Sequence, residues 1–144
     1  MPQRPISSVI AKRRVITGPP TMPVLEAARR MKELRVGSVL VVDHGRLVGI
    51  FTERDAVYRV MAEGRDAAKV TVGEVMTAHP QTIGPDKPVG MALLMMHEGG
   101  YRHVPVVSHG KPLGMITARD ALGPELREFE SELERRKRIG ELLG

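Results

Sequence analysis

Two short segments carry the side chains best suited to chemistry. Residues 49–55 read Gly-Ile-Phe-Thr-Glu-Arg-Asp, and residues 114–120 read Gly-Met-Ile-Thr-Ala-Arg-Asp. Thr-x-x-Asp at the start of a helix is typical of a capping box, in which the threonine and the acid each bond a backbone amide. The same residue types suit a nucleotide. Amides and a hydroxyl at a helix start attract phosphate, and an aspartate accepts two hydrogen bonds from a ribose diol. Both interpretations stay open at this point.

The two segments belong to an internal duplication. A shift of 65 residues aligns positions 17–56 with 82–121 without a gap. Identical pairs occur throughout this alignment, including Thr17 with Thr82, Pro23 with Pro88, Ala27 with Ala92, Met31 with Met96, His44-Gly45 with His109-Gly110, and Thr52 with Thr117. The chain therefore consists mainly of two similar copies.

Each copy predicts the order strand, helix, strand, strand, helix. Apolar residues recur at helical spacing after a short extended segment, and two β-branched runs then flank a His-Gly turn. The expected helices are 24–34 and 89–96, followed by a second helix from Thr52 to about Ala62 in copy one and from Thr117 to about Leu122 in copy two. Residues from about 64 to 74 join the copies. A unit of roughly 60 residues buries too little surface alone, so we expect the halves to pack sheet against sheet.

The repeat order, the Gly-x-x-Thr-x-x-Asp segment and the lead-in Val75-Met76-Thr77 together resemble the CBS domain, named for cystathionine β-synthase. A tandem pair of such domains is called a Bateman module. The resemblance extends to about Leu122. It implies an α/β fold of two CBS repeats with pseudo-two-fold symmetry. Repeat 1 and its lead-in would occupy residues 1–66, a linker and repeat 2 residues 67–123, and a C-terminal helix residues 124–144.

The resemblance also implies two nucleotide-binding sites, each built from both copies. In both, the aspartate of the motif would hold the ribose and the threonine would touch phosphate. The first site would comprise Thr117, Arg119, Asp120, His103, Ile16, Thr17, Val36 and Gly37. The second would comprise Thr52, Arg54, Asp55, Gln81, Thr82, Tyr101 and Arg102. We rank the first site higher for a charged nucleotide, because the basic pair Arg102-His103 aligns with the uncharged Gly37-Ser38. Both motif arginines also fit a solvated surface.

Composition and motifs favour a regulatory protein over an enzyme. The sequence has no cysteine, no Ser-His-Asp arrangement with supporting motifs and no phosphate-binding Walker loop, so we expect no catalysis and no catalytic cofactor. We expect no metal site either, since no element carries a metal-ligand pair of histidines. The expected ligand is AMP, ADP or ATP, whose binding would be signalled to an unknown regulated protein or through assembly.

Two alternatives remain. The net charge of +5 gathers at 12–14 and 135–138, which leaves a nucleic-acid-binding protein open, although the chain has few aromatic residues for base stacking. A structural adaptor with non-functional clefts is the other alternative. With no apolar run long enough for a membrane and no signal peptide, we expect a cytoplasmic protein.

A last helix is predicted from Glu125 to Leu143, after the stop-and-restart pair Gly123-Pro124. Acidic residues come early in it and basic residues late, as the helix dipole favours. Its apolar stripe is interrupted. The helix suits either a cover for its own domain or a dimer contact, and by resemblance we expect a homodimer.

Overall fold

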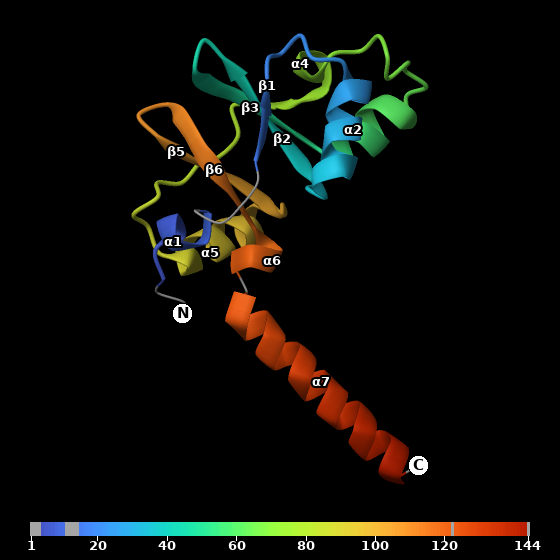
Figure 1. Ribbon diagram of the computed structural model, residues 1–144, viewed down its shortest axis with the longest axis vertical. Coiled ribbons are helices and arrows are strands. Elements are labelled where there is room, and N and C mark those ends of the chain that lie inside the picture. Colours follow the sequence, from blue (N-terminus) through green and yellow to red (C-terminus); the bar gives the residue numbers. More distant parts are fainter. Residues whose placement is uncertain (1–3, 11–14, 122, 144) are drawn as a thin grey trace.

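The computed structural model describes residues 4–10, 15–121 and 123–143, without the side chains of residues 120, 121, 124–130, 142 and 143. Two sheet-and-helix halves lie one above the other in Figure 1, and a long helix extends from the lower half. The halves correspond to the two copies in the sequence. Each half combines strands and helices, as expected for an α/β fold of two similar repeats.

Copy one forms a four-stranded sheet with the order β1-β2-β3-β4. Its strands are β1 (Ile16–Gly18), β2 (Ser38–Asp43), β3 (Arg46–Thr52) and β4 (Thr77–Ala78). β1 pairs with β2 in parallel, and the other pairings are antiparallel. Helix α2 (Val24–Leu34) separates β1 from β2, and β3 leads into α3 (Glu53–Asp55) and the π-helix η1 (Ala56–Met61). The apolar faces of α2 and η1 share one core with the sheet.

Copy two repeats this plan with a smaller sheet. Helix α5 (Val89–Gly99) precedes the hairpin β5 (His103–Ser108) and β6 (Lys111–Thr117), and α6 (Ala118–Ala121) follows. The strand expected at the start of this copy shortens to one parallel bridge between Ile83 and Val106. The lost positions are Gln81 and Thr82, which precede the bridge. In copy one the equivalent Thr17 pairs with Leu40, but copy two has Pro105 in place of Leu40, and proline cannot donate a ladder hydrogen bond.

The two hairpins turn in the same way. His44-Gly45 and His109-Gly110 each form a two-residue loop, with φ of 52° and 77° in the first and 52° and 79° in the second. Positive φ at both central residues is the type I′ conformation, which matches the twist of the flanking strands and favours glycine at the second position. Both ladders also carry an irregularity at the equivalent place, between Val41 and Val42 and between Val106 and Val107. The His-Gly prediction is thus confirmed.

The segment that precedes each copy packs on the other copy. Helix α1 (Ile6–Ile10) precedes copy one, yet Ile6 is fully buried in the core of copy two. Helix α4 (Val72–Val75) precedes copy two, yet Val72 is fully buried in the core of copy one. The sequence did not predict this exchange, because each segment is shorter than the window of about 11 residues over which a helical period is recognised.

Matching backbone hydrogen bonds hold the two exchanged helices. The amide of Ile6 donates to the carbonyl of Lys87 at 2.9 Å, and the amide of Val72 donates to that of Met22 at 2.8 Å. Two further pairs of bonds repeat the correspondence: Ser7 to Pro85 with Gly73 to Pro20, and Val89 to Arg4 with Val24 to Val70. These equivalent bonds give the molecule its pseudo-two-fold symmetry.

The sheets of the two copies face one another, as the sequence predicts. Leu40 and Ile50 of copy one form a buried cluster with Met115 of copy two. The amide of Leu47 donates to the carbonyl of Gly110 across the interface at 3.1 Å. This third apolar cluster joins the cores of the two halves.

The last helix, α7 (Gly123–Leu143), begins two residues before its predicted start. Gly123 and Pro124 open the helix, as expected where proline occupies a first-turn position. α7 runs away from both halves (Figure 1). From Ser131 to Glu141 every residue is exposed, so this part of the helix does not cover its own domain.

Candidate functional site

The starts of both hairpins bring the two motifs to one end of the molecule. Thr52 pairs with Ser38 where β3 ends, and Thr117 pairs with His103 where β6 ends. One further bond is the same in both copies. The amide of Glu53 donates to the carbonyl of Gly37 at 3.1 Å, and the amide of Ala118 donates to that of Arg102 at 3.0 Å. Each helix start is thereby fixed against the beginning of its own hairpin.

Side chains from both copies meet above Gly37. A Cβ atom at this position would lie 2.8 Å from Oε1 of Glu53 and 3.3 Å from Nε2 of His103. Gly37 and Glu53 belong to copy one, whereas His103 belongs to copy two. The structure therefore joins His103 to Gly37, two residues that the sequence assigned to one site. A side chain at position 37 would displace the Glu53 carboxylate and crowd His103.

The motif of copy one forms the capping box. The Asp55 amide donates to Oγ1 of Thr52 at 3.3 Å, and the Thr52 amide donates to Oδ2 of Asp55 at 3.0 Å. The Thr52 hydroxyl also donates to Oδ2 at 3.2 Å, and Nε of Arg59 lies 3.6 Å from Oδ1. Asp55 is only 6% exposed. Its carboxylate thus has a structural role, and a role in ribose binding at this position stays a prediction.

The motif of copy two is described only in part. Thr117 is half-buried at the end of β6, and Arg119 is exposed on α6. The side chain of Asp120 lies outside the described part of the structure, so its predicted contact with ribose is untested. Arg54 is also exposed and stacks over the ring of Tyr58, with 5.3 Å from its guanidinium carbon to the ring centroid. Both motif arginines thus lie on the surface, and their contacts with a nucleotide stay predictions.

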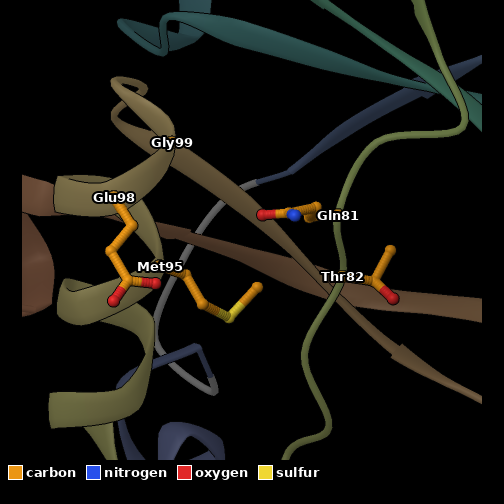
Figure 2. Close-up of a pocket in the computed structure, with 5 residues that line it drawn as sticks. All are labelled: Gln81, Thr82, Met95, Glu98 and Gly99. Carbon is orange, nitrogen blue, oxygen red and sulfur yellow. The ribbon is translucent and has the colours of Figure 1, made fainter.

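An open groove of about 430 Å³ contains residues predicted for the second site. Gln81 and Thr82 line one side of it, and Met95, Glu98 and Gly99 of α5 line the other. Figure 2 shows the side chains of Gln81 and Met95 extending toward one another, while that of Thr82 points away from α5. Gln81 and the threonine backbone are therefore the parts of this segment that a ligand in the groove would meet.

Tyr101 contacts two of the residues that line this groove. Its hydroxyl donates to Oε1 of Gln81, and its ring lies against Gly99. Burial and, to a lesser extent, the charge of Glu98 raise the pKa of the Tyr101 hydroxyl. The hydroxyl therefore stays protonated at neutral pH and keeps its role as a donor. The neighbouring Arg102 is exposed.

A second groove, of about 530 Å³, lies in copy one between α2 and the helices after β3. Val36, predicted for the first site, lines it together with Glu53, and the rest of its wall is Ala28, Met31, Lys32, Arg35, Ala56 and Val57. The other two predicted residues lie on β1. The Ile16 side chain is buried in the core of copy one, whereas Thr17 is exposed.

The comparisons with known proteins fit this arrangement. The CBS domain family model matches residues 6–62 and again residues 72–123. The chain belongs to the CBS domain family. Each match covers one copy together with the exchanged helix that precedes it.

Relatives of this CBS domain pair come from several lineages. An uncharacterized protein of Methanopyrus kandleri is 34% identical, over 86% of this chain and 69% of its own length. The chain spans 57% and 23% of two longer curated relatives, both CBS domain-containing proteins of Arabidopsis thaliana. A larger protein can thus contain a module of this kind.

Two similar solved structures contain ligands. A CBS domain protein of Pyrobaculum aerophilum complexed with AMP is 27% identical with a TM-score of 0.73, over 81% of this chain and 89% of that one. A CBS domain pair in complex with 5′-methylthioadenosine and S-adenosyl-L-methionine is 28% identical with the same TM-score, over 81% and 95% of the two chains. The fold of this chain is therefore that of proteins solved with adenosyl ligands.

The described ranges contain neither a membrane-spanning helix nor a cluster of metal-ligating side chains. No helix within residues 4–10, 15–121 and 123–143 combines the length and apolar character needed to cross a membrane. Nor do these residues include a group of three or more histidine, aspartate and glutamate side chains that suits a metal ion.

Sequence reasoning missed Glu53. This residue occupies an unspecified position of the Thr-x-x-Asp motif, and its partner in the alignment is Ala118. The contrast between an acid and an alanine at equivalent positions was the available signal. The α5 residues of the first groove gave no such signal, because Met95 has the helical spacing of a core residue.

Proposed function

We propose that this CBS domain pair is a non-catalytic regulatory module that binds an adenosyl ligand such as AMP, ADP or ATP between its two copies. The observation that carries the proposal is the meeting of His103 of copy two with Gly37 and Glu53 of copy one. A ligand bound there would contact both halves. The AMP and S-adenosyl-L-methionine complexes of similar CBS proteins support the choice of ligand class.

In the proposed mechanism, ligand binding shifts the equilibrium between different relative orientations of the two copies. A ligand that spans the two copies binds more tightly to the relative orientation that fits it, and only such a difference in affinity moves a conformational equilibrium. His103, on β5, and Glu53, the first residue of α3, belong to different halves, so a ligand that contacts both reports on the relative orientation of the halves. A partner protein, or a second copy of the chain, would read that orientation.

Mass spectrometry of co-purifying small molecules, followed by thermal unfolding with a ligand panel, tests the proposal. The panel contains AMP, ADP, ATP, 5′-methylthioadenosine and S-adenosyl-L-methionine, with GMP as the matched control for the base. Ligand at 100 times its Kd stabilises the folded state by about 2.7 kcal/mol, so a clear rise in Tm is expected for at least one adenosyl compound. If none of them raises the Tm at millimolar concentration, the proposal fails.

Substitution of His103 locates the site. His103→Ala should weaken binding of the preferred ligand and reduce the rise in Tm. His109→Ala is the control, since this exposed histidine lies in the hairpin turn at the opposite end of β5. Equal effects of the two substitutions would place the ligand elsewhere.

A further inference from the structure

Helix α7 has no partner in the described structure that accounts for its stability. The helix has 21 residues, a length of about 31 Å. Its side chains from Ser131 to Glu141 are exposed, including Leu133 at 49% and Ile139 at 54%. Most helical stability in proteins comes from the packing of one apolar face rather than from intrinsic propensity. A second surface that covers the exposed apolar side chains of α7 would therefore stabilise the helix.

The charges of α7 divide at its midpoint. Residues 125–134 contain five glutamates and one arginine, whereas residues 135–143 contain four basic residues and one glutamate. A second copy of α7 in antiparallel orientation would place each acidic half beside a basic half. A parallel pair would place like charges together. The charge pattern thus points to a self-complementary antiparallel pair, which closes on itself by two-fold symmetry.

A heptad pattern specifies the register of such a pair. Residues spaced alternately by three and four along α7 are Leu126, Phe129, Leu133, Arg136, Gly140 and Leu143. This is the spacing of the a and d positions of a coiled coil. In an antiparallel pair each a position faces a d position. A two-fold axis between residues 134 and 135 matches Leu126 with Leu143, Phe129 with Gly140, and Leu133 with Arg136.

Two of these layers explain residues that a lone helix would not favour. Glycine is a poor residue for a helix interior, and a Cβ atom at Gly140 would meet nothing within 4 Å. Opposite Phe129 of a second helix, this space accommodates an aromatic ring. Arg136 is held by Glu132 of its own helix at 2.9 Å, which directs its charge to the side and leaves its aliphatic stem for Leu133. The flanking e positions pair Glu130 with Lys137 of the other copy.

We propose that α7 is an assembly helix that binds α7 of a second copy of this chain in antiparallel orientation, with the two-fold axis between residues 134 and 135. The surface lies outside the proposed ligand site and does not depend on it. Because α7 extends away from the body, the two bodies would lie at opposite ends of the helix pair (Figure 1).

Spin labels on a matched pair of positions test the orientation. The chain has no cysteine, so Glu134→Cys and Glu141→Cys each provide one labelling site. Both positions have the same place in the heptad. In the proposed pair, label-to-label separation along the helix axis is about 1.5 Å for position 134 and about 20 Å for position 141. Pulsed electron-electron double resonance should give a clearly longer label-to-label distance for position 141 than for position 134. Equal distances would indicate a parallel pair, and no distance would indicate that α7 does not pair; either result overturns the proposal.

A charge exchange tests the register with the whole chain. Glu130→Lys and Lys137→Glu each replace two attractive contacts with two repulsive ones, and each should weaken association by roughly tenfold in analytical ultracentrifugation. The double variant Glu130→Lys/Lys137→Glu should restore association, because the opposite charges then face one another again. Failure of the double variant to recover, with unchanged helix content by circular dichroism, would overturn the proposed register.

Discussion

The two copies share a plan, but different segments complete them. Copy one has four strands, because β1 and the linker strand β4 extend its hairpin on both sides. Copy two keeps only the hairpin and the single bridge at Ile83. The second helix of copy one continues through η1 to Met61, whereas α6 of copy two ends at Ala121. Similar sequences therefore give similar hairpins, while the flanking chain decides how far each sheet and helix extends.

The polar residues of the two copies differ at the same end of the molecule. Ser38 is buried at the start of β2, where copy two has His103, and Glu53 follows β3, where copy two has Ala118. Because His103 reaches the copy-one residues Gly37 and Glu53, the two differences meet at one point. These two polar differences between the repeats therefore coincide with the proposed ligand site.

The largest effect should come from the exchanged helices. Ile6→Ala should lower the free energy of unfolding by about 2–5 kcal/mol, since Ile6 is fully buried. Although Ile6 precedes copy one, hydrogen exchange should accelerate first in β5 and β6 of copy two, where its side chain packs. Urea unfolding and hydrogen exchange measure the two quantities.

Two control variants accompany Ile6→Ala. Val72→Ala should reverse the pattern and accelerate exchange in β2 and β3, because Val72 packs in copy one. Met61→Ala should change little, since Met61 is 74% exposed. If Ile6→Ala accelerated hydrogen exchange in copy one instead, this result would contradict the packing of α1 on copy two.

Substitution of the two motif aspartates should have different effects, mainly on ligand affinity for Asp120 and mainly on stability for Asp55. If Asp120 holds the ribose, Asp120→Ala should weaken adenosyl binding by about tenfold or more, because a hydrogen bond to a charged group contributes about 1.5–3 kcal/mol. Asp55→Ala should instead remove the cap and lower stability by about 0.5–2 kcal/mol, with a smaller change in affinity. Calorimetric titration and urea unfolding measure both effects. Equal losses of affinity, or a larger loss for Asp55, would show that our ranking of the two sites is wrong.

The two copies should differ least in the loss of stability caused by substitutions at their hairpin turns. Gly45→Ala and Gly110→Ala each place a side chain at φ near 80°, which costs about 1–2 kcal/mol. The two costs should be similar, because the nearest atom to Gly110 belongs to the flexible side chain of Arg46. Asparagine tolerates positive φ, so Gly45→Asn is the control and should be less destabilising. A much larger loss at Gly110 would indicate that Arg46 cannot move.

Local patterns predicted most of the fold. The His-Gly turns, the helix at Val24–Leu34 and the facing sheets follow from turn chemistry, helical spacing and the need of each copy to bury an apolar face. The roles of α1 and α4 did not follow, because their few residues gain helical structure from packing on the opposite copy. The separation of α7 from the body was also not predicted, since its interrupted apolar stripe suited a covering helix equally well.

The candidate site was predicted unevenly. The duplication placed the two motifs at equivalent helix starts, and residues 103 and 37 are brought together as the resemblance implied. The contact of Glu53 with Gly37 was missed, because it depends on how one hairpin start meets the other rather than on any local pattern. The Thr-x-x-Asp spacing predicted either a capping role or a ribose-binding role for Asp55. In the structure Asp55 forms the capping box with Thr52.

The reciprocal placement of α1 and α4 has a consequence for the order of folding during synthesis. Copy one lacks its last pieces, α4 and β4, until residue 78 has left the ribosome. Helix α1 is made before all other elements described, yet its docking surface includes Val104 and Ile116, which appear about a hundred residues later. At about 5–20 residues per second, this delay is at least several seconds. The earliest helix should therefore be among the last to dock, and chaperones or premature partners have that interval in which to reach it.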